Sequence, residues 1–256
     1  SMAALVQEFS RSEHQKSWFR FFEVPMAHVA KRAAASITLH SKRALHATSR
    51  SSQRICPQTR NFTASVPADV KVMPFSLALG AEVVGLDISQ AMSPDVFLEI
   101  DSLIAEFLVL CFRGQTDAFT PELQIRFTEQ WGAVLPHPSD MCSGSRPAGF
   151  PREVAVMQEA STKWSTDLSC MEKPAGISVM RAVELPPPDQ NGAMSFANMQ
   201  RAWETLPPML RQRVGWLNAV HKSEIFQDES IHPVVRMHPK IGRSALYVSE
   251  HFIANF

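Results

Sequence analysis

The chain has 256 residues and no formal net charge, because 25 Lys and Arg residues balance 25 Asp and Glu residues. The balance hides an asymmetry: residues 1–66 carry ten basic and three acidic residues, which leaves fifteen and twenty-two for residues 67–256. A mildly acidic globular part argues against a nucleic-acid partner, whose binding surface is normally basic, and no apolar run reaches the ~20 residues of a membrane span.

Residues 1–68 form a basic extension for which we expect little fixed structure. Residues 24–68 hold seven Lys and Arg residues, many Ser, Thr and Ala, and no acidic residue. From Met26 onward this composition is typical of a mitochondrial presequence, and a disordered basic linker is an equal alternative. The four cysteines have neither metal nor redox spacing, so we expect an intracellular protein, either mitochondrial or cytoplasmic.

Residues 69–256 form the predicted domain, in which strands and helices mix. Short apolar runs separated by glycine predict strands near 72–87. Ser93 and Pro94 then begin a helix, since serine caps a helix and proline suits its first turn. Apolar residues at helical spacing should turn this helix toward a core. They are Phe97, Ile100, Leu103, Ile104 and Phe107.

A buried strand follows at 108–113, and a second helix begins at Thr120 and Pro121 and runs to Trp131. Residues 133–162 are rich in Pro, Gly and Ser and predict a long loop, of a length that is often functional. The loop carries His137. A single histidine in a loop is more often solvated than functional.

The next stretch reads Lys163-Trp164-Ser165-Thr166-Asp167-Leu168-Ser169. It resembles the metal-binding turn of the taurine dioxygenase (TauD/TfdA) family, whose members use non-haem Fe(II) and 2-oxoglutarate. The family turn reads Trp-His-Thr-Asp, and a His-x-Asp pair at the end of a strand supplies two of three iron ligands from one side. The resemblance implies Asp167 as a metal ligand, puts Ser165 at the position of the missing histidine, and puts Trp164 and His137 near the substrate pocket.

Other segments are similar to the same family. The order of elements before the turn fits, as do a helix through Ala202 and Trp203 and a strand pair over 231–248. The family's Gly-Asp-Thr motif, whose threonine helps to hold 2-oxoglutarate, corresponds to residues 192–194. Met194 therefore stands at the position of the missing threonine, and strand alternation would point the neighbouring Ser195 the other way.

The resemblance implies an α+β fold with a double-stranded β-helix, or jelly-roll, core and flanking helices. The family's third iron histidine and its 2-oxoglutarate arginine belong to a later segment, so we expect a C-terminally incomplete domain without the last strands. His232, His238 and His251 lie outside that context, and we predict that each is structural or solvated. Unpaired strand edges would favour a homo-oligomer that covers them.

Serine binds divalent metals poorly, whereas this iron chemistry requires two imidazoles and one carboxylate. We therefore expect a TauD/TfdA-like homologue with a degraded site and weak or absent activity, and we assign no catalytic residue. Fe(II) and 2-oxoglutarate are the implied cofactors. Two alternatives stay open: an active dioxygenase that hydroxylates a small organic acid, and a metal-free protein that binds a small acid or has a regulatory role.

Overall fold

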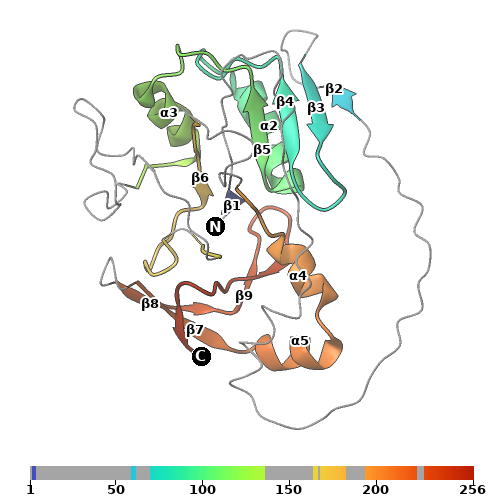
Figure 1. Ribbon diagram of the computed structural model, residues 1–256, viewed down its shortest axis with the longest axis vertical. Helices are drawn as coiled ribbons and strands as arrows, with labels where there is room; N and C mark the ends of the chain where they lie inside the picture. The colour runs from blue at the N-terminus through green and yellow to red at the C-terminus, as the bar shows by residue number, and fades with distance from the viewer. Residues whose placement is uncertain are drawn as a thin grey trace, which may run out of the picture.

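The computed structural model describes residues 2–3, 59–61, 70–135, 164–166, 168–182, 194–223 and 228–256. Within them helices and strands mix, and the strands belong to sheets of four, three, two and two strands (Figure 1). The α+β mixture is as predicted. The described strands do not by themselves trace the two facing sheets of a jelly roll.

The first half of the domain is a four-stranded sheet with one helix packed on it (Figure 1). Its neighbours β2 and β3, and β3 and β4, are antiparallel, whereas β4 and β5 are parallel. Helix α2 supplies the crossover that parallel neighbours need. In sheet order with the helix last, the bounds are β2 (Arg60–Asn61), β3 (Lys71–Pro74), β4 (Ala81–Val84), β5 (Leu110–Arg113) and α2 (Pro94–Phe107). Strand β2 lies before the boundary predicted at residue 68.

Helix α2 begins where the sequence predicted, with the Ser93 side chain accepting a hydrogen bond from the Val96 amide. Ile100, Leu103 and Ile104 are buried against the sheet. Phe97 and Phe107 are only partly buried. The following strand is shorter than predicted, because the helix ends at Leu108 in the left-handed conformation, with φ 67°.

A second helix, α3 (Pro121–Thr128), begins at the predicted Thr120 cap and continues as a 3₁₀ turn, η1 (Glu129–Trp131). The Phe127 ring packs edge-on against the rings of Phe112 and Trp131, with centroids 5.8 and 5.3 Å away. The Trp131 indole donates a 2.9 Å hydrogen bond to Asp101 on α2. Aromatic packing thus joins this helix to the core of the first half.

The second half of the domain contains α4 (Met199–Thr205) and α5 (Pro208–Val214), and α5 lies beside one end of a three-stranded sheet (Figure 1). That antiparallel sheet has the order β11-β7-β8, and β9 and β10 form a separate antiparallel pair, as predicted for 231–248. The bounds are β7 (Asn218–Lys222), β8 (Glu229–Pro233), β9 (Val235–Met237), β10 (Ser244–Leu246) and β11 (Ile253–Asn255).

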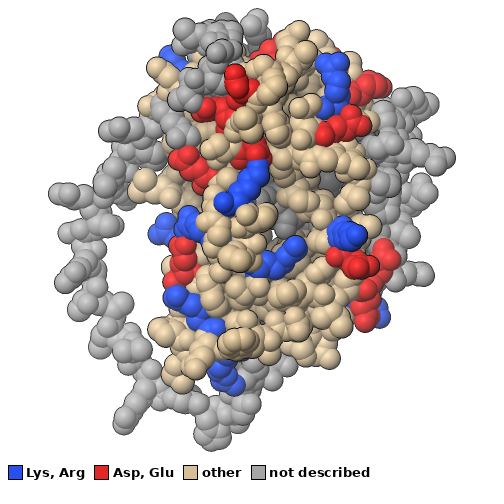
Figure 2. All heavy atoms as spheres, turned by 180° about the vertical axis from the view of Figure 1, so that it is seen from behind, with Lys and Arg blue, Asp and Glu red and all other residues tan. Residues whose placement is uncertain are grey.

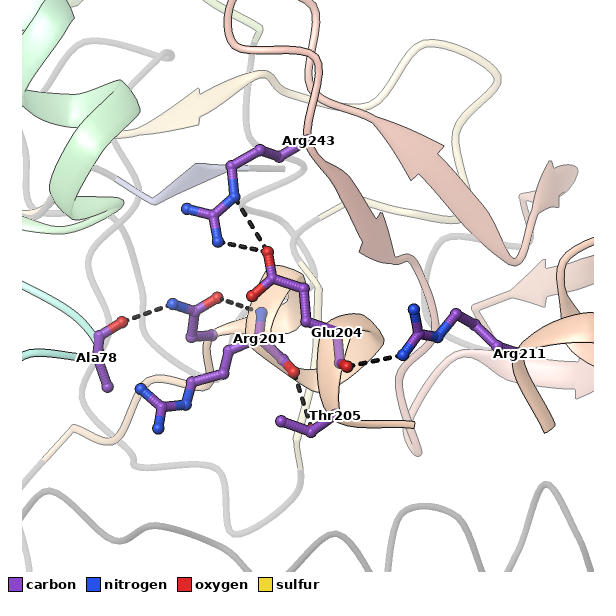
Figure 3. A network of polar contacts seen from close by, with 7 residues as sticks. Ala78, Arg201, Glu204, Thr205, Arg211 and Arg243 are labelled. Atoms are coloured by element: carbon purple, nitrogen blue, oxygen red, sulfur yellow. Dashed lines mark hydrogen bonds and ion pairs between the residues drawn. The ribbon is translucent and has the colours of Figure 1, made fainter. Parts of the chain in front are cut away.

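Specific polar contacts join the two halves. Asn198 caps α4 through a 2.9 Å bond from the Arg201 amide, and its side-chain amide donates a 2.5 Å bond to the Ala78 carbonyl in the first half (Figure 3). On the same helix, Glu204 accepts from Arg243, which lies just before β10. Asn198 therefore both caps α4 and links it to a distant segment of the chain.

Between the halves lies β6 (Ile177–Ser178), which pairs in parallel with β1 (Met2–Ala3). The carbonyl of Val179 accepts a 3.0 Å hydrogen bond from Gln124 on α3.

Basic and acidic side chains are interspersed on the face that Figure 2 shows. No helix in the described ranges is both long and apolar enough to cross a membrane.

Candidate metal centre

The candidate metal turn has no regular secondary structure at 164–166. Ser165 is exposed, and Trp164 and Thr166 are half-buried. The end of a strand that the sequence predicted here does not form at these three residues, so their side chains need not follow strand alternation. Asp167 and His137 lie outside the described residues.

Backbone hydrogen bonds fix both sides of the turn. The His251 amide, just before β11, donates to the Trp164 carbonyl at 3.2 Å, and the Ser169 amide donates to the Thr166 carbonyl at 3.2 Å. After Asp167 the chain turns sharply: buried Leu168 has φ 53°, and its carbonyl accepts from the Met171 amide at 3.0 Å. A left-handed leucine is costly, so surrounding contacts must hold it in place.

Two strands of the second half supply those contacts. On β8, His232 Nε2 lies 2.9 Å from the Met171 carbonyl oxygen. The thiol of Cys170 is buried, and burial raises its pKa; the Asp228 carboxylate adds to the rise, while hydrogen bonds from its own backbone and from Ser223 oppose it. The segment that follows Asp167 therefore contacts β8 and the residue just after β7.

Beneath this segment lies a buried cluster of three rings, His221 from β7, His232 from β8 and Tyr247 just after β10. His221 stacks on Tyr247 with centroids 5.2 Å apart, and His232 meets both rings edge-on at 5.2 and 5.5 Å. The Arg236 guanidinium lies 4.5 Å from the centroid of the Tyr247 ring.

The cluster keeps His221 neutral at physiological pH. Burial lowers the pKa of His221 to about 4, mainly by removing its charged form from water. The neighbouring His232 and Arg236 lower it further, while the nearby Tyr247 backbone acts in the opposite direction. A neutral imidazole is therefore part of the packed interior.

Sequence reasoning gave His221 no role. In the structure Ala219 and His221 form the buried face of β7, but the strand's sequence, Asn-Ala-Val-His-Lys, has no alternation of apolar and polar residues that would have shown it. His232 and His238 were predicted to be structural or solvated; both are buried, and the His238 ring accepts from the Lys240 amide at 3.1 Å. His251 is exposed and packs edge-on against Phe252.

Met194, at the position of the family's threonine, is 43% exposed. Residues 194–198 lead into α4 without forming a strand, and Ser195 is exposed as well. The alternation expected to separate these two side chains therefore does not apply. A thioether is at best a weak hydrogen-bond acceptor and cannot replace a hydroxyl donor.

The described part of the turn lacks the imidazole that an Fe(II) site of this type uses. Among the residues that the structure describes, no three His, Cys, Asp or Glu side chains converge to hold a metal ion. At the turn itself the described side-chain oxygens are the neutral hydroxyls of Ser165 and Thr166, and Ser165 stands where a 2-His-1-carboxylate site needs an imidazole.

A family model described as taurine catabolism dioxygenase TauD, TfdA family matches residues 71–256. This chain belongs to that TauD/TfdA family. The match covers every described element from β3 to β11.

Similarity to individual proteins supports the same family assignment. An alkylsulfatase of Acinetobacter baylyi is 27% identical over 197 residues, which cover 68% of this chain and 61% of the relative. An alpha-ketoglutarate-dependent sulfate ester dioxygenase of Pseudomonas putida is 28% identical, with coverages of 75% and 69%. The crystal structure of a taurine dioxygenase from Burkholderia xenovorans has a TM-score of 0.58 at 28% identity, over 72% of this chain and 64% of that one. The chain thus spans less than two thirds of the alkylsulfatase and of that structure.

Proposed function

We propose that this chain is a TauD/TfdA dioxygenase homologue with a weakened iron and 2-oxoglutarate site. The observation that carries the proposal is Ser165, a hydroxyl where the family turn has an imidazole. Met194 supports it, because a thioether replaces the hydroxyl that helps to hold 2-oxoglutarate. We further infer a jelly-roll core, which the likeness to taurine dioxygenase structures supports.

The physical reason lies in the ligands that Fe(II) prefers. Imidazole nitrogen and carboxylate oxygen bind it well in a facial arrangement, and a neutral hydroxyl contributes little. Asp167 is then the one strong donor of the turn. A single carboxylate holds a divalent ion weakly, because much of the coordination shell stays with water.

Restoring the imidazole tests this reading. Ser165→His should raise the affinity for Mn(II), measured by the loss of the free-ion EPR signal, at least about tenfold, since changes in supporting residues alone shift metal affinity by 10–100-fold. Ser195→His is the matched control, because it adds a histidine at another exposed serine of the chain. An unchanged affinity in Ser165→His, or an equal gain in the control, contradicts the proposal.

A second candidate function is an active Fe(II)/2-oxoglutarate dioxygenase acting on a small organic acid. The names of the relatives favour it, since one is a sulfate ester dioxygenase at 28% identity. Anaerobic addition of Fe(II) and 2-oxoglutarate to the unaltered chain, followed by the admission of air, separates the candidates. A weakened site gives no charge-transfer absorption and no oxygen consumption, whereas both signals establish the active enzyme. Binding of 2-oxoglutarate without metal, by calorimetry, identifies the metal-free acid binder.

A further inference from the structure

Among the described residues, hydrogen bonds from the second half of the domain reach the candidate metal turn on both of its sides. On its N-terminal side the His251 amide binds the Trp164 carbonyl at 3.2 Å. On its C-terminal side His232 binds the Met171 carbonyl at 2.9 Å. Of these two contacts the second uses a side chain, so it can be altered by substitution without changing the backbone.

The contact defines the proton on His232. A carbonyl oxygen accepts hydrogen bonds, so the ring must donate through Nε2–H. The ring has little freedom to turn away, because it is buried and meets His221 and Tyr247 edge-on. The bond is partly buried, so losing the donor leaves the Met171 carbonyl less well satisfied and loosens the segment.

We propose that His232 is a positioning residue for the metal turn. Its described hydrogen bond is to the backbone of the turn. It acts through the Met171 carbonyl, which lies four residues beyond Asp167, and it holds the left-handed bend at Leu168 that follows Asp167. The inference rests on the proposed function only in treating Asp167 as a ligand.

Hydrogen exchange of the whole chain tests the positioning directly. In His232→Leu, the amides of Ser169 and Met171, which close the turn, should exchange about tenfold faster, while α2 keeps its protection. In His232→Gln, the side-chain amide can donate from nearly the same place and should restore slow exchange. His238→Leu is the matched control, since it removes another buried histidine and should loosen residues 238–242 alone.

Three outcomes overturn the proposal. One is unchanged exchange at 168–171 in His232→Leu. Another is an equal loss in the His238→Leu control. The third is a folded His232→Gln whose turn exchanges as fast as in the leucine variant, which would point to ring packing instead of the hydrogen bond. If His232→Leu does not fold, the comparison of His232→Gln with the unaltered chain decides.

A metal measurement separates this inference from the proposed function. In the Ser165→His background, His232→Leu should lower Mn(II) affinity by about 10–100-fold, the range seen for residues that orient ligands. If Ser165→His gains no affinity, the proposed function fails, and the exchange data still decide the role of His232. If the gain survives His232→Leu, the positioning role fails alone.

Discussion

Phenylalanine in place of His221 should make the stability of this domain less dependent on pH. In the folded protein the pKa of His221 is about 4, against 6.5 for the free side chain. Below pH 6.5 the unfolded chain takes up a proton that the folded chain refuses. The free energy of unfolding therefore falls as the pH falls from 6.5 toward 4, and His221 contributes no pH dependence above this window.

The magnitude follows from the two pKa values. The full separation corresponds to about 3.4 kcal/mol, and the part lost between pH 7.5 and pH 5 is about 2 kcal/mol. His221→Phe keeps an aromatic ring against Tyr247 and cannot titrate. Urea unfolding at both pH values should show the variant losing about 2 kcal/mol less than the unaltered chain.

The loss of unfolding free energy between the two pH values is measured in each protein, and the difference between the two losses is the contribution of His221. Burial also lowers the pKa of His238, but that histidine is present in both proteins and cancels in the difference. His251→Gln, at an exposed position, is the control and should follow the unaltered chain. The reasoning is refuted if the phenylalanine variant and the unaltered chain lose equal stability, within about 0.5 kcal/mol, over this pH range.

Two further predictions concern the contacts of α4 (Figure 3). Asn198→Ala removes both the helix cap and the hydrogen bond to the Ala78 carbonyl. It should lower the free energy of unfolding, measured by urea titration, by about 2–3 kcal/mol. A loss below about 0.5 kcal/mol would contradict the double role of Asn198. Arg243→Gln breaks an ion pair with Glu204 in which both side chains are about half exposed. The variant should therefore lose under about 1 kcal/mol of unfolding free energy, and 1 M NaCl should remove most of that difference. A larger loss that persists in salt would show that the ion pair is not screened.

The family, the mixture of helices and strands and the starts of both early helices can be predicted from the amino-acid sequence alone. Ser93 with Pro94 and Thr120 with Pro121 are local signals, because a cap bonds an amide three residues away and needs no distant partner. The substitution at Ser165 is equally visible in the sequence, since the chemistry of a donor is a property of its side chain. The end of a strand was also expected at the metal turn, but residues 164–166 do not form one.

The support of that turn depends on contacts between segments that are far apart in the sequence. No local pattern showed that His221 faces an interior, or that it meets His232 on β8 and Tyr247 just after β10. The contact between His232 and the Met171 carbonyl joins residues 61 positions apart. Such contacts depend on how β7, β8 and the hairpin of β9 and β10 pack together. Packing depends on the whole chain, and no local pattern in the sequence records it.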